Sequence, residues 1–135
     1  MYDNILIPIV FDQQNDHSQA IECAKRLAGE NPNITMLSVI ELLPSYVMSY
    51  VPDKATEERR VELQHEMDTL VKGVPGATCE IISGHPGRAI IDYANANGTN
   101  LIIVKSHRPG FQDYFLGSTA AYVVRRAKCA VHVIR

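Results

Sequence analysis

The stretch from Val104 to Thr119, with the sequence VKSHRPGFQDYFLGST, holds the side chains of this chain that are best suited to chemistry. Near its start stand three groups that can carry a proton or a positive charge: Lys105, His107 and Arg108. It ends in Gly117-Ser118-Thr119, directly before apolar residues at helical spacing. A helix N-terminus offers unpaired N–H groups and the positive end of its dipole, and both favour phosphate. The stretch therefore predicts a phosphate or nucleotide pocket.

A simpler interpretation of Gly117-Ser118-Thr119 is helix capping, in which Ser or Thr satisfies backbone donors that every helix leaves open. The Walker sequence G-x-x-x-x-G-K-[ST], which would identify a phosphate loop directly, does not occur in the chain. The cationic residues at the opposite end of the loop favour the anion site, because a capping sequence does not need them. Both interpretations stay open from the residues alone.

The elements that would position this loop alternate regularly along the chain. Short apolar segments at 4–10, 33–40, 77–82, 101–104 and 130–135 are typical of buried strands, and the segments between them have helical spacing. The order β-α-β-α-β-α-β-α-β predicts one α/β domain over residues 1–135, a three-layer sandwich with a parallel sheet between helices. Ligands bind such sheets beyond the carboxyl ends of the strands, where the strand order reverses. Strands one and four are the expected neighbours there, so Pro8-Ile9-Val10 and Val104-Lys105-Ser106 flank one crevice.

Several local signals fix the expected boundaries. Pro8 cannot donate to a ladder and is expected near the carboxyl end of the first strand. Asp16 is a candidate cap for a helix over 17–29, which Gly29 and Asn31-Pro32 would end. A long amphipathic helix is expected from Lys54 to about Lys72. The segment 41–53 between strand and helix is rich in apolar residues and is either a loop folded back over the sheet, a lid, or a partner surface.

Composition excludes several classes of protein. A formal net charge of −2 over 135 residues argues against nucleic acid as the main partner. No apolar run reaches the ~18 residues of a membrane span, and the N-terminal sequence lacks signal-peptide features, so a cytoplasmic protein without membrane insertion is expected. The three cysteines and five histidines have no metal-like spacing, which predicts reduced thiols and no metal site.

Short blocks in the same order along the whole chain resemble the universal stress protein family. Asn4–Ile9 is similar to the family's opening strand, and Gly84-His85-Pro86 with Ile90 is similar to its G-x-P-x-x-x-I junction. The SHRP, LGS and VVRRAKCAV sequences between 106 and 131 are similar to the enterobacterial F-type branch of small, single-domain members. The resemblance implies strand order 3-2-1-4-5, four helices and a Rossmann-like, adenine nucleotide alpha hydrolase-like fold. It also implies a dimer that pairs fifth strands through Val131, Val133 and Ile134, unless loops of the chain cover that edge.

The ATP-binding motif of this family, G-x-x-G, nine residues, then G-[ST], is kept here in its last part, Gly117-Ser118. Its two earlier glycine positions fall on Lys105 and Arg108, with eight residues before Gly117 and with Gly110 inside the loop. The acidic residue that usually faces adenine is replaced by Val10, with Asp12 two positions further on, whereas Val39 matches an apolar contact to adenine. Arg108 could contact phosphate directly where other members offer a glycine N–H.

Three functions follow from these observations. The first is a dimeric, cytoplasmic stress-response regulator that binds ATP, with ADP, AMP and Mg²⁺ as further candidate ligands. Its expected contacts are Pro8, Ile9, Val10, Val39, Val104, Lys105, Ser106, His107, Arg108, Gly117, Ser118 and Thr119. The second is slow ATP hydrolysis or self-phosphorylation on Ser118 or His107. It lacks support because Asp113 is the one carboxylate in the loop and no residue is assigned as catalytic. The third is a module without a nucleotide that acts through protein contacts, which the changed motif positions favour.

Overall fold

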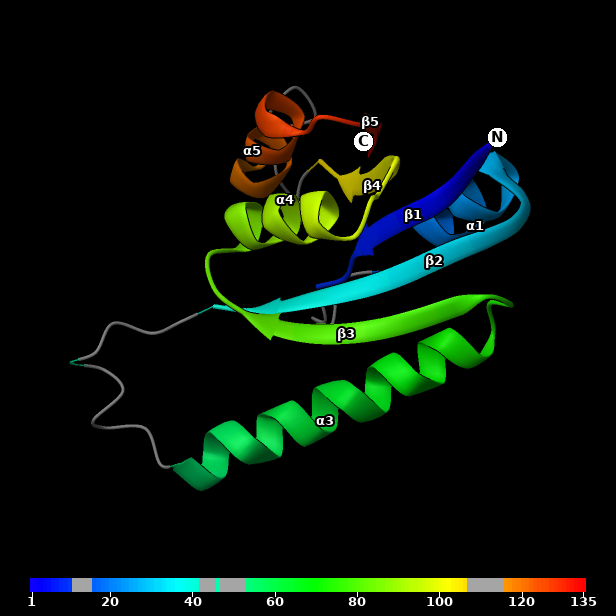
Figure 1. The fold of residues 1–135 in the computed structure, drawn as a ribbon. Helices are drawn as coiled ribbons and strands as arrows, with labels where there is room; N and C mark the ends of the chain where they lie inside the picture. The colour runs from blue at the N-terminus through cyan, green and yellow to red at the C-terminus, as the bar shows by residue number, and fades with distance from the viewer. Residues whose placement is uncertain (11–15, 42–45, 47–52, 107–115) are drawn as a thin grey trace.

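The computed structural model describes residues 1–10, 16–41, 46, 53–106 and 116–135 of the chain. Five parallel strands form one sheet in the order β3-β2-β1-β4-β5, as expected (Figure 1). The strands are β1 (Tyr2–Pro8), β2 (Ala28–Ile40), β3 (Ala77–Ser83), β4 (Leu101–Lys105) and β5 (Ala130–Ile134). The order runs outward from β1 to β3 and then restarts on the other side of β1 with β4 and β5. The predicted reversal of strand order therefore lies between β1 and β4.

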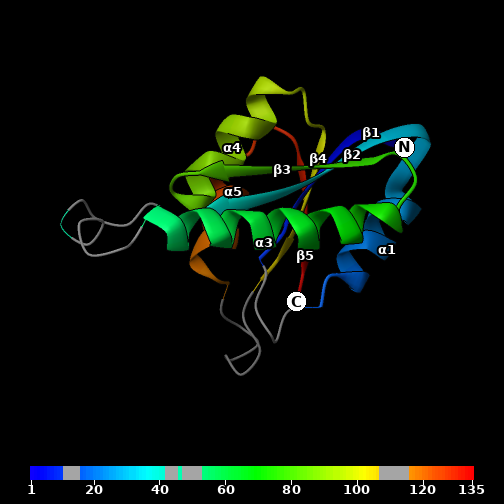
Figure 2. The same ribbon diagram turned by 90° about the horizontal axis from the view of Figure 1, so that it is seen from below.

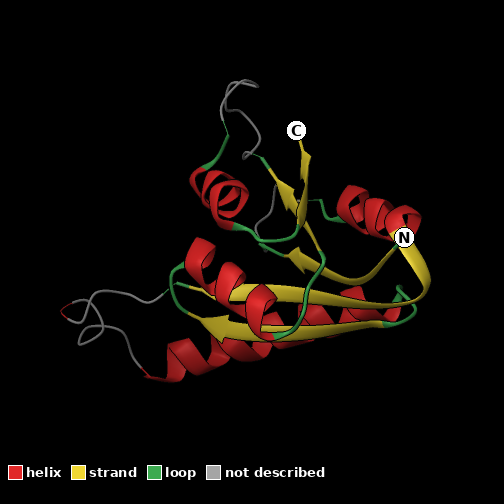
Figure 3. Cartoon of the chain, turned by 45° about the horizontal axis from the view of Figure 1, so that its top comes forward, coloured by secondary structure: helices red, strands yellow, loops and turns green. Residues whose placement is uncertain are grey.

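Helices cover both faces of this sheet, so the predicted three-layer sandwich is confirmed. The described helices are α1 (Ser18–Leu27), α3 (Asp53–Lys72), α4 (Pro86–Ala96) and α5 (Ser118–Arg126). Helices α1 and α3 lie on one face, with α3 along β2 and β3, whereas α4 and α5 lie together on the other (Figures 2 and 3). No helix in the described part of the chain is both long and apolar enough to cross a membrane.

The apolar runs of the central strands fill a core on each face. On β1, Ile5 and Ile7 pack with α1 and α3, whereas Leu6 packs with α4 and α5. On β4, Ile103 and Val104 face opposite sides in the same way. All five side chains are at most 4% exposed. Burial on both faces explains why these strands are almost continuously apolar rather than alternating with polar residues.

The boundary between the first helix and the second strand differs from the expectation. Helix α1 ends at Leu27, and β2 begins at Ala28 rather than at residue 33. The pairing of β1 with β2 moves from Tyr2↔Ala28 to Asn4↔Asn33, so an irregular stretch of β2 stands against a short piece of β1. We expected Gly29 and Asn31-Pro32 to end the helix ahead of the strand. This expectation was wrong, because β2 includes these residues in an irregular, bulge-like stretch.

The two proline predictions agree with the structure, whereas the Asp16 cap prediction is wrong. Pro8 is the last residue of β1, and Pro86 is the first residue of α4, where its missing N–H costs nothing. Asp16 is not the N-cap of α1, because His17 occupies that position, but the Asp16 carboxylate accepts a 2.9 Å hydrogen bond from the N–H of Ser18. Pro86 therefore starts α4 directly after the carboxyl end of β3.

Candidate functional site

The carboxyl ends of β1 and β4 lie side by side at the reversal of strand order. Ile5 pairs with Leu101 and Leu6 pairs with Ile102, so the two strands run in parallel toward the same edge. Beyond β1, the N–H of Ile9 donates a 2.8 Å hydrogen bond to Leu37, which extends the pairing with β2. In open parallel sheets this is the position where ligands bind.

The start of α5 is held directly against the end of β4. The N–H of Ser106 donates a 2.8 Å hydrogen bond to Ile134, and the carbonyl oxygen of Ser106 accepts a hydrogen bond from the N–H of Gly117. Ser106 is fully buried, so these main-chain bonds form a fixed joint between β4, β5 and α5. The N-terminus of α5 therefore opens at the carboxyl edge of the sheet.

The structure also decides between capping and an open helix start. The N-cap of α5 is Gly117, which has no side chain, and Ser118 and Thr119 are the first two helical residues. The interpretation of Ser118 or Thr119 as the capping residue is therefore wrong. Ser118 is exposed and Thr119 is half-buried, so both hydroxyl groups lie at a helix start where an anion is favoured.

Lys105 connects the end of β4 to the start of α1. Its Nζ atom donates a hydrogen bond to the main-chain oxygen of Asp16. The pKa of the Asp16 carboxyl is lowered, first by the hydrogen bond from the main chain of Ser18 and then by that from the Ser18 side chain, with a smaller effect of the Lys105 charge. The cation of Lys105 is thus kept at the crevice by the loop that enters α1.

The apolar residues predicted to line the crevice differ in exposure. Ile9 is 2% exposed and Val104 is 4% exposed, and they pack in the cores on opposite faces of the sheet, so they offer little surface to a ligand. Val10 is 58% exposed, whereas Pro8 and Val39 are half-buried. The predicted site residues His107 and Arg108 lie outside the described residues, as do Asp12, Gly110, Asp113 and most of the segment 41–53.

A cavity of about 530 Å³ opens next to the start of α5. It is lined by residues from the ends of β2 and β3 and from the starts of α4 and α5: Glu41, Gly84, His85, Pro86, Ser118, Thr119 and Tyr122. Two helix N-termini therefore meet in one cavity and favour an anionic group at that end, whereas the Glu41 carboxylate, which also lines the cavity, repels one. Its volume lies within the ~300–1,000 Å³ range of small-molecule sites.

The wall of this cavity contains residues that the motif analysis did not assign to the site. His85 is the N-cap of α4, and its Nδ1 accepts a 3.3 Å hydrogen bond from the N–H of Arg88. Its ring lies 5.6 Å from the ring of Tyr122, and the Arg126 guanidinium lies 4.5 Å from the centre of that same ring. Tyr122 follows Ser118 by one helical turn, and this spacing is the signal that could have placed it beside the site.

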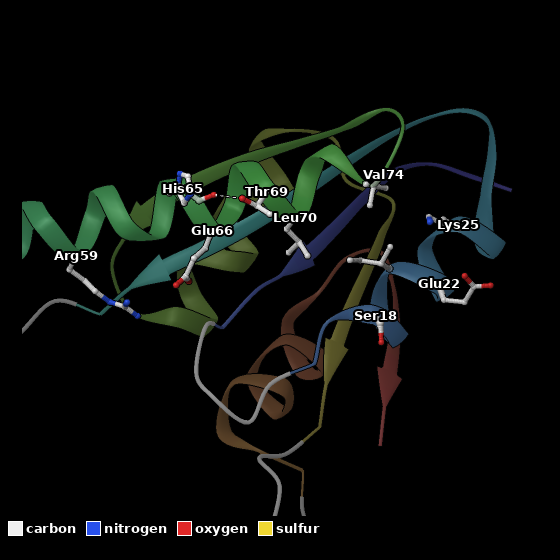
Figure 4. Close-up of a pocket in the computed structure, with 11 residues that line it drawn as sticks. Ser18, Glu22, Lys25, Arg59, His65, Glu66, Thr69, Leu70 and Val74 are labelled. Atoms are coloured by element: carbon white, nitrogen blue, oxygen red, sulfur yellow. Dashed lines mark hydrogen bonds between the residues drawn. The ribbon is translucent and has the colours of Figure 1, made fainter.

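A larger groove of about 1,120 Å³ runs between α1 and α3 on the opposite face (Figure 4). Both acidic and basic side chains line it, including Glu22 and Lys25 from α1 and Arg59 and Glu66 from α3. Apart from Ser18 at the start of α1, no helix start contributes to it, and it contains no predicted site residue. The smaller cavity is therefore the better candidate for the nucleotide, because it combines helix N-termini with the predicted hydroxyl groups.

Among the described residues, no group of three His, Cys, Asp or Glu side chains is arranged to hold a metal ion. The pKa of Tyr93, on α4, is raised by burial and by its contacts with Glu80. The titratable groups with shifted pKa values are otherwise at the surface or are cysteines away from this edge. The local chemistry is therefore that of hydrogen-bond donors and helix dipoles, which suits binding of a phosphate group.

Comparison with known proteins identifies relatives over the whole chain. A model described as "Universal stress protein family" matches residues 1–135. Universal stress protein A homolog 2 of Coxiella burnetii is 31% identical, with 99% of this chain and 95% of that protein aligned. The structure of the universal stress protein UspA from Lactobacillus plantarum has 26% identity and a TM-score of 0.72, over 99% of this chain and 98% of that one. A family member from Arabidopsis thaliana solved with AMP bound has 18% identity and a TM-score of 0.67, over 98% and 90% of the chains.

Proposed function

This chain belongs to the universal stress protein family, and from that membership we propose that it binds an adenine nucleotide, with ATP as the first candidate. Solved structures of the same fold include universal stress proteins in complex with AMP, dAMP and cAMP. These relatives support adenine as the base and leave the number of phosphates to experiment. The similarity to the F-type branch remains a prediction.

The observation that carries this proposal is the hydrogen bond from the N–H of Gly117 to the oxygen of Ser106. It brings the uncapped start of α5 to the carboxyl edge of β1 and β4, where parallel sheets bind ligands. A phosphate group there would receive hydrogen bonds from helix N–H groups and from the Ser118 and Thr119 hydroxyls. Bonds of this kind to a charged group are worth ~1.5–3 kcal/mol each, more than neutral ones.

The remaining predicted residues fall into two groups in this proposal. Lys105, the last residue of β4, and His107 and Arg108 after it in the sequence would supply positive charge to the phosphates. Pro8, Val10 and Val39 lie at or just beyond the ends of β1 and β2 and are proposed to contact the base and ribose outside the 530 Å³ cavity, which none of them lines. A valine at position 10 cannot accept a hydrogen bond from adenine, so base selectivity should be weaker than phosphate affinity.

We further propose that the protein acts in the cytoplasm as a homodimeric regulator that pairs its β5 edges. Strand β5 is the last strand of the sheet on its side, so the described chain has no neighbour beyond it. The carbonyl of Ile134 points toward β4, where it accepts from Ser106, and neighbouring residues in a strand alternate. The main-chain groups of Val131 and Val133 therefore point outward, available to a second copy.

A second candidate function is a module without a nucleotide that acts through protein contacts. It is favoured by Val10, which is 58% exposed at the position where the family usually has an acidic residue that faces adenine. Lys105, in place of the first motif glycine, also donates a hydrogen bond to the main-chain oxygen of Asp16, which uses part of its capacity to bind a phosphate. The two functions differ in one measurable property, which is nucleotide occupancy.

The deciding experiment is to denature freshly purified protein and to analyse the supernatant by anion-exchange chromatography with mass detection. We expect an adenine nucleotide near one per chain, or binding of added ATP, ADP or AMP in isothermal titration calorimetry. The mass names the base and the number of phosphates. An empty supernatant together with no heat at millimolar nucleotide would overturn the proposal and leave the protein-contact function in its place.

A further inference from the structure

Away from the nucleotide site, a thiol and an imidazole contact each other between α1 and β5. The Sγ atom of Cys23 lies 3.7 Å from Nε2 of His132, although the residues are far apart in the sequence. On β5, His132 shares its side of the sheet with Ile134, which packs in the core under α1 and α3. The fold therefore turns the imidazole toward α1, where Cys23 borders the same core.

This pair is accessible to solvent, and the cationic side chain next to it is itself ion-paired. Cys23 is half-buried and His132 is exposed. Arg26 stands one helical turn after Cys23 and forms a 2.9 Å ion pair with the Glu22 carboxylate, which raises the pKa of the guanidinium. A thiolate is favoured by nearby cationic groups, and it is the reactive form of cysteine.

The other two cysteines have different surroundings. Burial raises the pKa of Cys79, and its hydrogen bond to the Asp68 carboxylate raises it further. Burial also raises the pKa of Cys129. Both thiols are therefore kept in the protonated form, and no imidazole contact is found for them among the described residues. Cys79 and Cys129 therefore serve as internal controls for the reactivity of Cys23.

We propose that Cys23 is a modification site, a thiol activated by His132 for reaction with hydroperoxides. Unprotonated Nε2 accepts the thiol proton, which leaves a thiolate facing an imidazolium. The thiolate sulfur attacks one peroxide oxygen, the O–O bond breaks, and cysteine becomes sulfenic acid. The peroxide is reduced: its second oxygen leaves as hydroxide from hydrogen peroxide, or as alkoxide from an organic hydroperoxide, and the imidazolium proton converts it to water or an alcohol. An external thiol can then displace water from the sulfenic acid to give a mixed disulfide.

This site is compatible with pairing of β5 edges in a homodimer. Edge pairing would use the outward main-chain groups of Val131 and Val133, whereas His132 directs its side chain to the sheet face under α1. The inference is also independent of nucleotide binding, because neither residue belongs to the nucleotide site. Loss of one property therefore leaves the other testable in the same preparation.

The test measures modification of each cysteine in the intact folded protein at one fixed neutral pH. Hydrogen peroxide is added with dimedone, which traps sulfenic acid, and peptide mass spectrometry follows the three cysteines separately. We expect Cys23 to be labelled at least about tenfold faster than Cys79 and Cys129, as for thiols with a neighbouring imidazole. Equal rates for Cys23 and Cys129 would overturn the proposal without any variant.

The role of His132 is tested with His132→Gln, with His65→Gln as the matched control on the exposed surface of α3. If the imidazole acts only by covering the thiol, its removal exposes Cys23 and the rate rises. If it takes the proton, the rate falls by about tenfold, and added imidazole restores labelling in His132→Ala. An unchanged or faster rate in His132→Gln, with an unaltered unfolding transition, overturns the assignment.

Discussion

A Cβ atom on Gly87 would lie 2.8 Å from the ring of Tyr122, closer than real Cβ contacts come. Gly87 is buried in the first turn of α4, and Tyr122 projects from α5, so the two helices meet where a side chain would not fit. The atoms in question include Cβ and Cγ of Tyr122, which cannot move aside without moving α5. This contact fixes the spacing of the two helix N-termini that open into the candidate cavity.

The first prediction is that Gly87→Ala destabilises the protein by about 1–3 kcal/mol, the usual cost of an overpacked contact. Without a clash, replacing glycine by alanine in a helix would stabilise the protein by up to about 1 kcal/mol. A loss of stability in Gly87→Ala would therefore indicate the clash. Urea unfolding measures it. Gly73→Ala is the control, because its Cβ would meet nothing closer than 3.8 Å. In a Tyr122→Ala background the penalty of Gly87→Ala should shrink, because Cγ and Cδ1 are removed while Cβ stays 2.9 Å away. An undiminished penalty there would contradict the contact.

The second prediction concerns charge at the start of α5. Ser118→Asp adds an anion at the positive end of the helix dipole and should stabilise the fold by about 0.3–1 kcal/mol. The same charge repels phosphate by about 1–4 kcal/mol at 4 Å separation, so nucleotide affinity should fall by at least about fivefold. Calorimetric titration and thermal unfolding measure the two effects. Thr69→Asp, on exposed α3, carries the same charge and should leave affinity unchanged. If Ser118→Asp keeps its nucleotide affinity, the phosphate does not bind at the start of α5.

The third prediction is a pH dependence caused by Tyr93. Its pKa is raised above 10.0 by burial, then by the charge of Glu80 and a hydrogen bond to it, while a hydrogen bond with Thr35 acts in the opposite direction. Because the folded state favours the neutral phenol, its contribution to stability is complete below pH 10 and is lost as pH rises through the raised pKa. Urea midpoints of the wild type should therefore fall more steeply above pH 10 than those of Tyr93→Phe. Parallel slopes would mean that Tyr93 does not contribute.

The fourth prediction tests dimerisation through β5. Val133→Pro removes an outward N–H without removing a donor to β4, so it should produce a monomer that keeps its sheet. Sedimentation velocity measures the mass, and circular dichroism checks the fold. Val124→Ala, an exposed apolar change on α5, should leave the assembly unchanged. A dimer that survives Val133→Pro would place the interface elsewhere.

Much of this fold follows from local sequence. The apolar runs of β1 and β4, the proline at position 8 and the Pro86 helix start depend on burial and on backbone chemistry within a few residues, and the structure agrees with each. The alternation of strands and helices likewise leaves few topologies. The start of β2 was misjudged because Gly29 and Pro32 carry turn signals that the neighbouring strand β1 overrides through an irregular pairing.

The candidate site depends on contacts that no local pattern contains. The sequence determined that Ser118 and Thr119 stand at a helix start, because glycine and helical periodicity are local properties. The tertiary structure decided that Gly117 is the N-cap and is joined to Ser106. It also brought His85 and Tyr122 to the same cavity and Cys23 to His132. Such pairs form because packing of whole helices on the sheet brings distant residues together, and that packing is a property of the complete chain.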